Sequence, residues 1–77
     1  MPVVQDDVAQ LHRAWEELHT RLREQEQCLS AAIAAYGRGR AGKPETLMEE
    51  VEQMRAECAV RFKALMDAVR AQSPASN

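Results

Sequence analysis

Turn-forming and aromatic residues are scarce in this chain, and its glycines are confined to one place. The 77 residues include three glycines and three prolines, and every glycine lies between residues 37 and 42. The aromatic residues, 4% of the chain, are Trp15, Tyr36 and Phe62. The chain therefore has one break, over residues 37–44. A chain of this length has no room for a sheet beside the segments that flank the break.

The chain also lacks an excess of positive charge, a long apolar run and a cysteine framework. Ten lysines and arginines against 12 acids give a net charge of −2, which does not favour general nucleic-acid affinity. No stretch approaches the roughly 20 apolar residues of a membrane span. Residues 1–7 carry acids where a signal peptide carries bases. Cys28 and Cys58 are too few for the disulfide framework of small secreted proteins. We therefore expect a cytoplasmic protein with two free, buried thiols.

Apolar residues before the break recur with the period of an amphipathic helix. Their steps of four and three residues indicate a heptad pattern from about residue 5 to residue 36. The two series of the pattern are Val8, Trp15, Leu22, Leu29 and Tyr36, and Val4, Leu11, Leu18, Gln25 and Ala32. Asp6 or Asp7 is expected to start this helix. Gly37 is expected to end it, because glycine accepts the left-handed conformation that follows many helices.

A second apolar stripe predicts a helix from about residue 45 to residue 72. Pro44 suits the first turn of such a helix. The stripe consists of Leu47, Val51, Met54, Cys58, Phe62, Leu65 and Val69. One step of four residues replaces a step of three, and such a stutter weakens the supercoil. Residues 73–77, which begin with Ser73 and Pro74, are expected to form a frayed tail.

These two helices predict an all-α fold, with one helical-hairpin domain over residues 1–77. The loop, residues 37–44, is short, so the helices are expected to pack antiparallel and coiled-coil-like. The expected neighbours across the pair are Leu22 with Cys58, Leu29 with Met54, and Trp15 with Leu65. Two helices cannot enclose a core, and small domains often need a partner. We therefore expect two hairpins to dimerise into a four-helix bundle, or a partner helix to complete the fold.

Several apolar residues fall outside this pairing, and the loop is basic. The residues that we expect to bind a partner are Ile33, Met48, Val60 and Met66, together with Arg38, Arg40 and Lys43 of the loop. Methionine repacks easily around different partners, and burying one large aliphatic side chain is worth roughly 1.5–3 kcal/mol. The expected partner is a second copy of the chain, as a homodimer, or a helical protein. We expect no membrane, nucleic acid or small-molecule substrate.

Two patterns that suggest chemical sites are better explained by structure. The pattern G-x-G-x-x-G-K over residues 37–43 matches the glycine fingerprint of dinucleotide sites, but that fingerprint follows a strand, and here a helix precedes it. His12, Glu16 and His19 share one helix face, and Glu-x-x-His occurs in di-iron bundles. The opposing helix offers no further carboxylates facing inward at the same level. We expect surface histidines, no resident metal or cofactor, and no catalytic residue, since no nucleophile and base are suitably spaced.

These observations favour a small non-enzymatic adaptor or regulatory protein that acts by helix-mediated protein–protein binding. The stretch from Ala35 to Met54, a basic glycine-containing loop followed by Pro44-Glu45 and a second helix, resembles the small hairpin co-chaperones of bacterial type III secretion. That resemblance implies a complex with a larger helical chaperone that shields a secretion substrate. The architecture is also similar to Rop-like hairpin dimers of plasmid copy control, which implies RNA binding through a basic stripe across the dimer. The net charge does not favour that last alternative.

Overall fold

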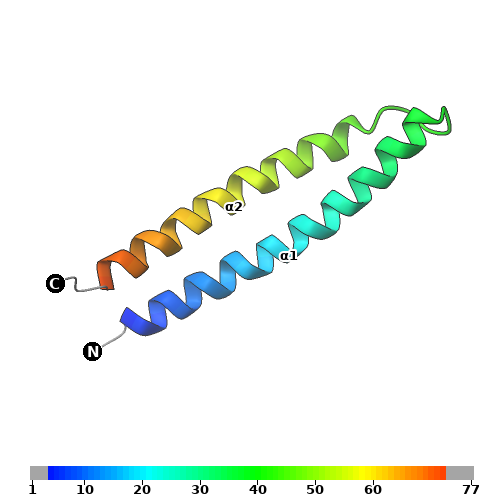
Figure 1. The fold of residues 1–77 in the computed structure, drawn as a ribbon. Helices are drawn as coiled ribbons and strands as arrows, with labels where there is room; N and C mark the ends of the chain where they lie inside the picture. Colours follow the sequence, from blue (N-terminus) through cyan, green and yellow to red (C-terminus); the bar gives the residue numbers. More distant parts are fainter. Residues whose placement is uncertain (1–3, 73–77) are drawn as a thin grey trace.

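The protein is an antiparallel pair of long helices joined by one loop (Figure 1). The computed structural model describes the backbone of residues 4–72 and the side chains of residues 7–72. Helix α1 spans Val4–Gly37 and helix α2 spans Glu45–Gln72. The hairpin measures 58 × 19 × 15 Å. The predicted all-α hairpin is thus confirmed, and the predicted tail, residues 73–77, lies outside the described residues.

Helix α1 begins at Val4, two or three residues before the aspartates that we expected to start it. The side chains of residues 4–6 are outside the described part, and the expected cap at Asp6 lies among them. Helix α2 begins at Glu45, as predicted, and an acid in the first turn suits the positive end of the helix dipole. Neither α1 nor α2 is both long enough and apolar enough to cross a membrane.

The end of α1 is closed by Gly39, and the prediction that Gly37 takes this role is wrong. Gly39 has a φ of +75°, while Gly37 is the last residue of α1. The amide of Gly39 donates to the carbonyl of Tyr36 at 2.9 Å, and the amide of Arg40 donates to the carbonyl of Ala35 at 2.9 Å. This pair of bonds is the Schellman arrangement, which satisfies carbonyls at the end of a helix. Glycine takes the left-handed conformation at low cost, and here the residue that takes it is Gly39, two residues after the last helical residue.

The buried residues of α2 keep a strict seven-residue spacing. They are Val51, Cys58 and Leu65, and Val51 is only 1% exposed. Phe62 and Val69 are 44% and 42% exposed, so the predicted stutter in the buried stripe is not present. Residues at intervals of seven stay in line along a supercoiled pair, whereas Phe62 and Val69 are turned about 50° toward one flank.

The centre of the hairpin is a small apolar cluster whose pairing agrees with the expected register. Leu22, Val51 and Cys58 form its buried part. The partly buried residues that pack against it are Trp15, Leu18, Leu29, Leu47 and Met54. The expected proximity of Leu22 to Cys58 is therefore confirmed. Trp15, which we expected near Leu65, has its ring against Phe62, with 5.5 Å between the ring centroids.

The two cysteines differ in environment, which corrects one expectation. Both are free thiols, but Cys58 is buried and Cys28 is exposed. Cys28 lies one residue before Leu29 of the heptad series. One residue is about 100° of helix rotation, so the side chain of Cys28 points away from the contact between α1 and α2.

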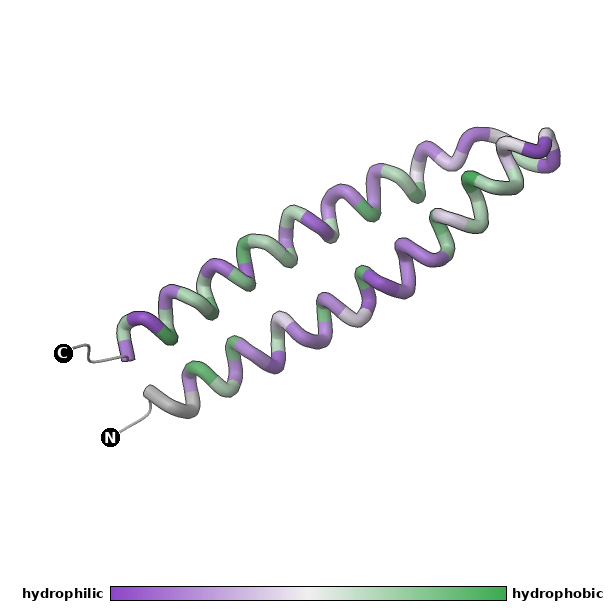
Figure 2. Tube along the Cα trace, viewed as in Figure 1, coloured by the Kyte–Doolittle hydropathy of each residue, from purple (hydrophilic) through white to green (hydrophobic). Residues whose placement is uncertain are grey.

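Figure 2 shows the hydropathy pattern of the hairpin, in which apolar and hydrophilic segments alternate along both helices.

Candidate protein-binding face

An aromatic cluster lies on one flank of the hairpin, toward its open end. The ring of Trp15 stacks on that of His19, with 4.9 Å between the centroids and 23° between the planes. His12 lies 6.0 Å from Trp15 on the other side, and Phe62 approaches at 5.5 Å from α2. The spacing of Trp15 and His19, four residues apart, places both rings on one side of α1. The cluster thereby joins the two helices through Trp15 and Phe62.

An ion pair on the same flank ties α1 to α2 near their middle. Nε of Arg55 lies 2.9 Å from Oε2 of Glu26, and the two side chains are 57% and 37% exposed. The remaining ion pairs among the described side chains each lie within one helix. This pair therefore marks the register of the hairpin directly. One heptad from it toward the loop, α1 presents Ile33 and α2 presents Met48.

The same heptad spacing identifies the residues of this flank toward the open end of the hairpin. One heptad away from the ion pair in the other direction are His19 and Phe62, and one heptad further are His12 and Val69. We name this flank the aromatic face. It consists of His12, Trp15, His19, Glu26 and Ile33 of α1 and Met48, Arg55, Phe62, Met66 and Val69 of α2. It is apolar at both ends, with histidines at the open end and one ion pair between the ends.

Exposed large apolar side chains are concentrated on this face. Five such residues stand out among the described side chains, namely Ile33, Tyr36, Val60, Phe62 and Val69. Three of these, Ile33, Phe62 and Val69, belong to the aromatic face. They occupy equivalent heptad positions and therefore lie on one flank, Ile33 toward the loop and Phe62 and Val69 toward the open end. Single exposed apolar residues are ordinary, whereas several on one flank make that flank a candidate binding surface.

The predicted partner-binding residues divide into three groups. Ile33, which is 49% exposed, and the half-buried Met48 and Met66 lie on the aromatic face. Val60 is 67% exposed and lies two residues from Phe62, about 200° around α2, so it points away from that face. The loop residues Arg38, Arg40 and Lys43 are exposed. The structure therefore does not unite Val60 with the other apolar candidates.

The opposite flank of the hairpin has a polar middle. A groove of about 330 Å³ there is lined by Leu18, Arg21, Gln25, Glu50, Gln53, Met54 and Glu57. Gln25, the polar residue of the heptad series, is half-buried in this groove. Five of the seven lining residues are charged or amide-bearing, so the two flanks differ in kind. Among the exposed large apolar residues, Ile33, Phe62 and Val69 lie on the aromatic face.

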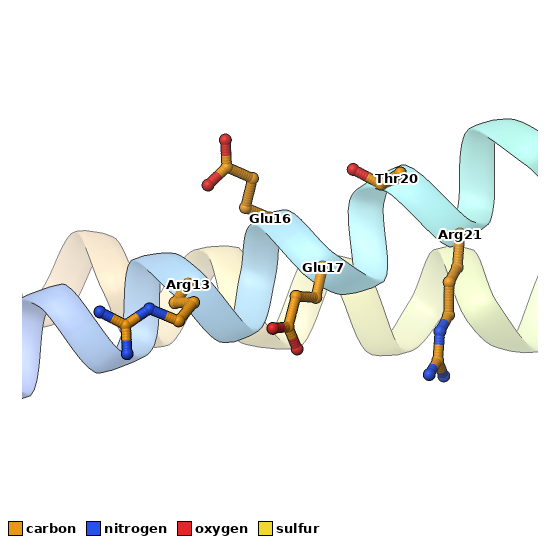
Figure 3. Close-up of a pocket in the computed structure, with 5 residues that line it drawn as sticks. All are labelled: Arg13, Glu16, Glu17, Thr20 and Arg21. Carbon is orange, nitrogen blue, oxygen red and sulfur yellow. The ribbon is translucent and has the colours of Figure 1, made fainter.

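A shallow depression in the surface is formed by one helix. Its volume is about 660 Å³, and its lining residues are Arg13, Glu16, Glu17, Thr20 and Arg21. Figure 3 shows these side chains spread outward from α1, with α2 behind the ribbon. Ligand pockets enclose most of the surface of a small molecule. A depression lined by a single helix does not provide such an enclosure.

Of the two histidines, His12 lies beside a carboxylate, but neither belongs to a cluster of metal ligands. Nδ1 of His12 lies 3.8 Å from Oε1 of Glu16, with both side chains more than half exposed. His19 is half-buried and turned to Trp15 instead. Within the part of the chain that the structure describes, no three His, Cys, Asp or Glu residues are grouped as metal ligands.

The comparisons with known proteins found nothing similar to this chain. No protein-family model matches it, and neither a curated protein nor a solved structure matches it. The site therefore has to be understood from its own residues. Sequence reasoning missed that Trp15, Phe62 and Val69 lie on one flank, because it assigned all three to the buried seam. The signal that could have separated them was the strict seven-residue series Val51, Cys58 and Leu65.

Proposed function

We propose that this chain is a small non-enzymatic adaptor or regulatory protein that binds a helical protein surface through its aromatic face. The observation that carries the proposal is the exposure of Ile33, Phe62 and Val69 at equivalent heptad positions on one flank. Covering the exposed half of each of these side chains would contribute roughly 1 kcal/mol. A few such side chains are significant for a chain in which four hydrophobic residues are buried among the side chains of residues 7–72.

A helix is the partner element that fits this face. The two helices of the hairpin leave a shallow depression between them on this flank, of about 250 Å³, lined by Glu26, Leu29, Ser30, Ile33 and Arg55. An amphipathic helix places its apolar residues at three- and four-residue intervals, and Phe62, Met66 and Val69 of the aromatic face have this spacing on α2. The central ion pair offers both signs of charge to a polar residue on the partner. We also propose a cytoplasmic location, since two free thiols suit a reducing compartment.

Photo-crosslinking inside cells tests this proposal with a matched control. A photoreactive amino acid replaces Val69 on the aromatic face in one variant and Val60 on the far side of α2 in the other. We expect crosslinks to a protein with a helical segment, or to the chain itself, from position 69 and not from position 60. Equal yields from both positions, or none from position 69, would contradict the proposal.

The crosslinked product also separates the two alternatives. A larger helical chaperone crosslinked from position 69 would favour the co-chaperone hypothesis, which uses the same face. The RNA hypothesis requires a stripe of basic residues across the dimer. On α1, the basic residues Arg13 and Arg21 alternate with the acids Glu16 and Glu17. RNA affinity that falls steeply with salt would be needed to support it.

A further inference from the structure

We infer that the occupant of the aromatic face is a second copy of this chain, packed so that both loops lie at the same end of a four-helix assembly. The inference rests on the proposed function and names both its partner and its geometry. It follows from the distribution of charge on the aromatic face and from the symmetry that a pair of identical chains obeys.

The aromatic face is complementary to itself. In a two-fold symmetric dimer, the same surface of each copy meets the other. Such a surface must offer apolar groups against apolar groups and one sign of charge against the other. The aromatic face has apolar groups at both ends, and Glu26 and Arg55 lie side by side in its middle, joined at 2.9 Å. It therefore satisfies both conditions without any change of side chain.

The ion pair selects between the two ways of stacking such a face on itself. When the two-fold axis runs along the helices, α1 of each copy lies over α2 of the other and the loops share one end. Glu26 then faces Arg55 of the second copy, and the four charges alternate in sign. When the axis runs across the helices, α1 lies over α1 and Glu26 faces Glu26. Like charges placed opposite each other at an interface disfavour that arrangement.

The same-end arrangement also brings the two basic loops together. Arg38, Arg40 and Lys43 of each copy are exposed, so water and salt screen their mutual repulsion over a Debye length of about 8 Å at physiological ionic strength. Glu45 follows each loop in the first turn of α2 and offsets part of the charge. The central charges are covered by the second copy and are screened less, so they decide the orientation.

Sedimentation equilibrium tests whether the second copy binds at this face. We expect a dimer for the unmodified chain. Ile33→Glu, which puts a charge on the aromatic face, should weaken dimerisation at least tenfold, and Val60→Glu should leave it unchanged. The helix content of both variants, measured by circular dichroism above and below the dissociation constant, checks that the hairpin still folds. A monomeric unmodified chain, or equal weakening by Val60→Glu, overturns the inference.

A charge swap places the ion pair in the interface. Glu26→Arg and Arg55→Glu each create like charges across the dimer, so each variant alone should dissociate at concentrations where the unmodified chain is dimeric. In an equimolar mixture, each introduced charge meets its opposite on the other copy. We expect the mixture to form a heterodimer, seen by native mass spectrometry. A mixture that stays monomeric like its components overturns the inference.

Spin-label distances decide the orientation. A label at Arg40→Cys, in a Cys28→Ser background with the buried Cys58 retained, reports the separation of the two loops. The end of α1 lies about 16 Å along the helix from Glu26, so loops at opposite ends would be more than about 33 Å apart. Loops at the same end would be less than about 25 Å apart, given helix spacings of about 10 Å. The longer distance overturns the same-end geometry.

The outcomes distinguish this inference from the proposed function. A monomer whose position 69 crosslinks to a different helical protein rejects the second copy and supports the proposed function. A monomer whose positions 60 and 69 crosslink equally rejects both. A dimer that has the short distance between loops, and that is weakened by Ile33→Glu but not by Val60→Glu, supports both the inference and the proposed function.

Discussion

Arg55 of α2 donates from Nε to Oε2 of Glu26 on α1 across 2.9 Å, and this contact joins residues 29 positions apart in the chain. It lies midway between two apolar ends of the same flank, Trp15 with Phe62 on one side and Ile33 with Met48 on the other. This one contact thus helps to set the alignment of α1 against α2. In our inference, the same two charges also set the orientation of the two copies in the dimer.

A double-mutant cycle on Glu26 and Arg55 measures how much their interaction contributes to the stability of the hairpin. We expect Glu26→Gln and Arg55→Gln to show a coupling energy of about 0.2–1 kcal/mol, the range of exposed pairs, because the side chains are 37% and 57% exposed. Urea unfolding at a protein concentration below the dissociation constant of the dimer, where the pair is exposed, gives the free energies, and 1 M salt should reduce the coupling. Glu26 cycled against Arg61, which pairs with Glu57 on its own helix, serves as the control. Equal coupling in both cycles would contradict the pairing.

Two valines of α2 provide a matched test of the core. Val51 is 1% exposed and Val60 is 67% exposed. Val51→Ala should lower the free energy of unfolding by roughly 1.5–3 kcal/mol, the value of two buried methyl groups plus the space they leave. Val60→Ala should change it by less than about 0.5 kcal/mol, since it removes no packing. Thermal unfolding followed by circular dichroism measures both, and similar losses would contradict the burial difference.

The hairpin was predictable because its signals are local, while the composition of its faces was not. Confinement of the glycines to residues 37–42 fixed the break, and heptad spacing fixed the helices on either side. Phe62 and Val69 fit the same three-and-four spacing as buried residues, so hydrophobicity alone does not separate them from Cys58 and Leu65. Their exposure depends on how α2 is rotated against α1, which is decided by the packing of all seam residues together.

The aromatic cluster offers a spectroscopic prediction. His19 stacks on Trp15, the one tryptophan of the chain, at 4.9 Å, whereas His12 is at 6.0 Å. Removing a ring that stacks on the indole exposes more of the indole to water, and this exposure moves the emission maximum to longer wavelength. We expect His19→Ala to shift the emission maximum of Trp15 to longer wavelength more than His12→Ala does, both measured at one pH. A larger shift for His12→Ala would contradict the stacking.

The loop glycines give a prediction in which two similar substitutions have opposite signs. Gly39 holds a φ of +75° and Gly37 is helical, and a methyl group at either position meets nothing within 4 Å. Any difference therefore comes from backbone conformation. Gly39→Ala should lower the free energy of unfolding by roughly 1–2 kcal/mol, the cost of a left-handed alanine. Gly37→Ala should raise it by roughly 0.5–1 kcal/mol, because alanine favours the helix. Urea titrations of both variants at one protein concentration measure the two changes. If Gly37→Ala destabilised the protein and Gly39→Ala had no effect, the left-handed residue would be Gly37, as expected from the sequence, and not Gly39.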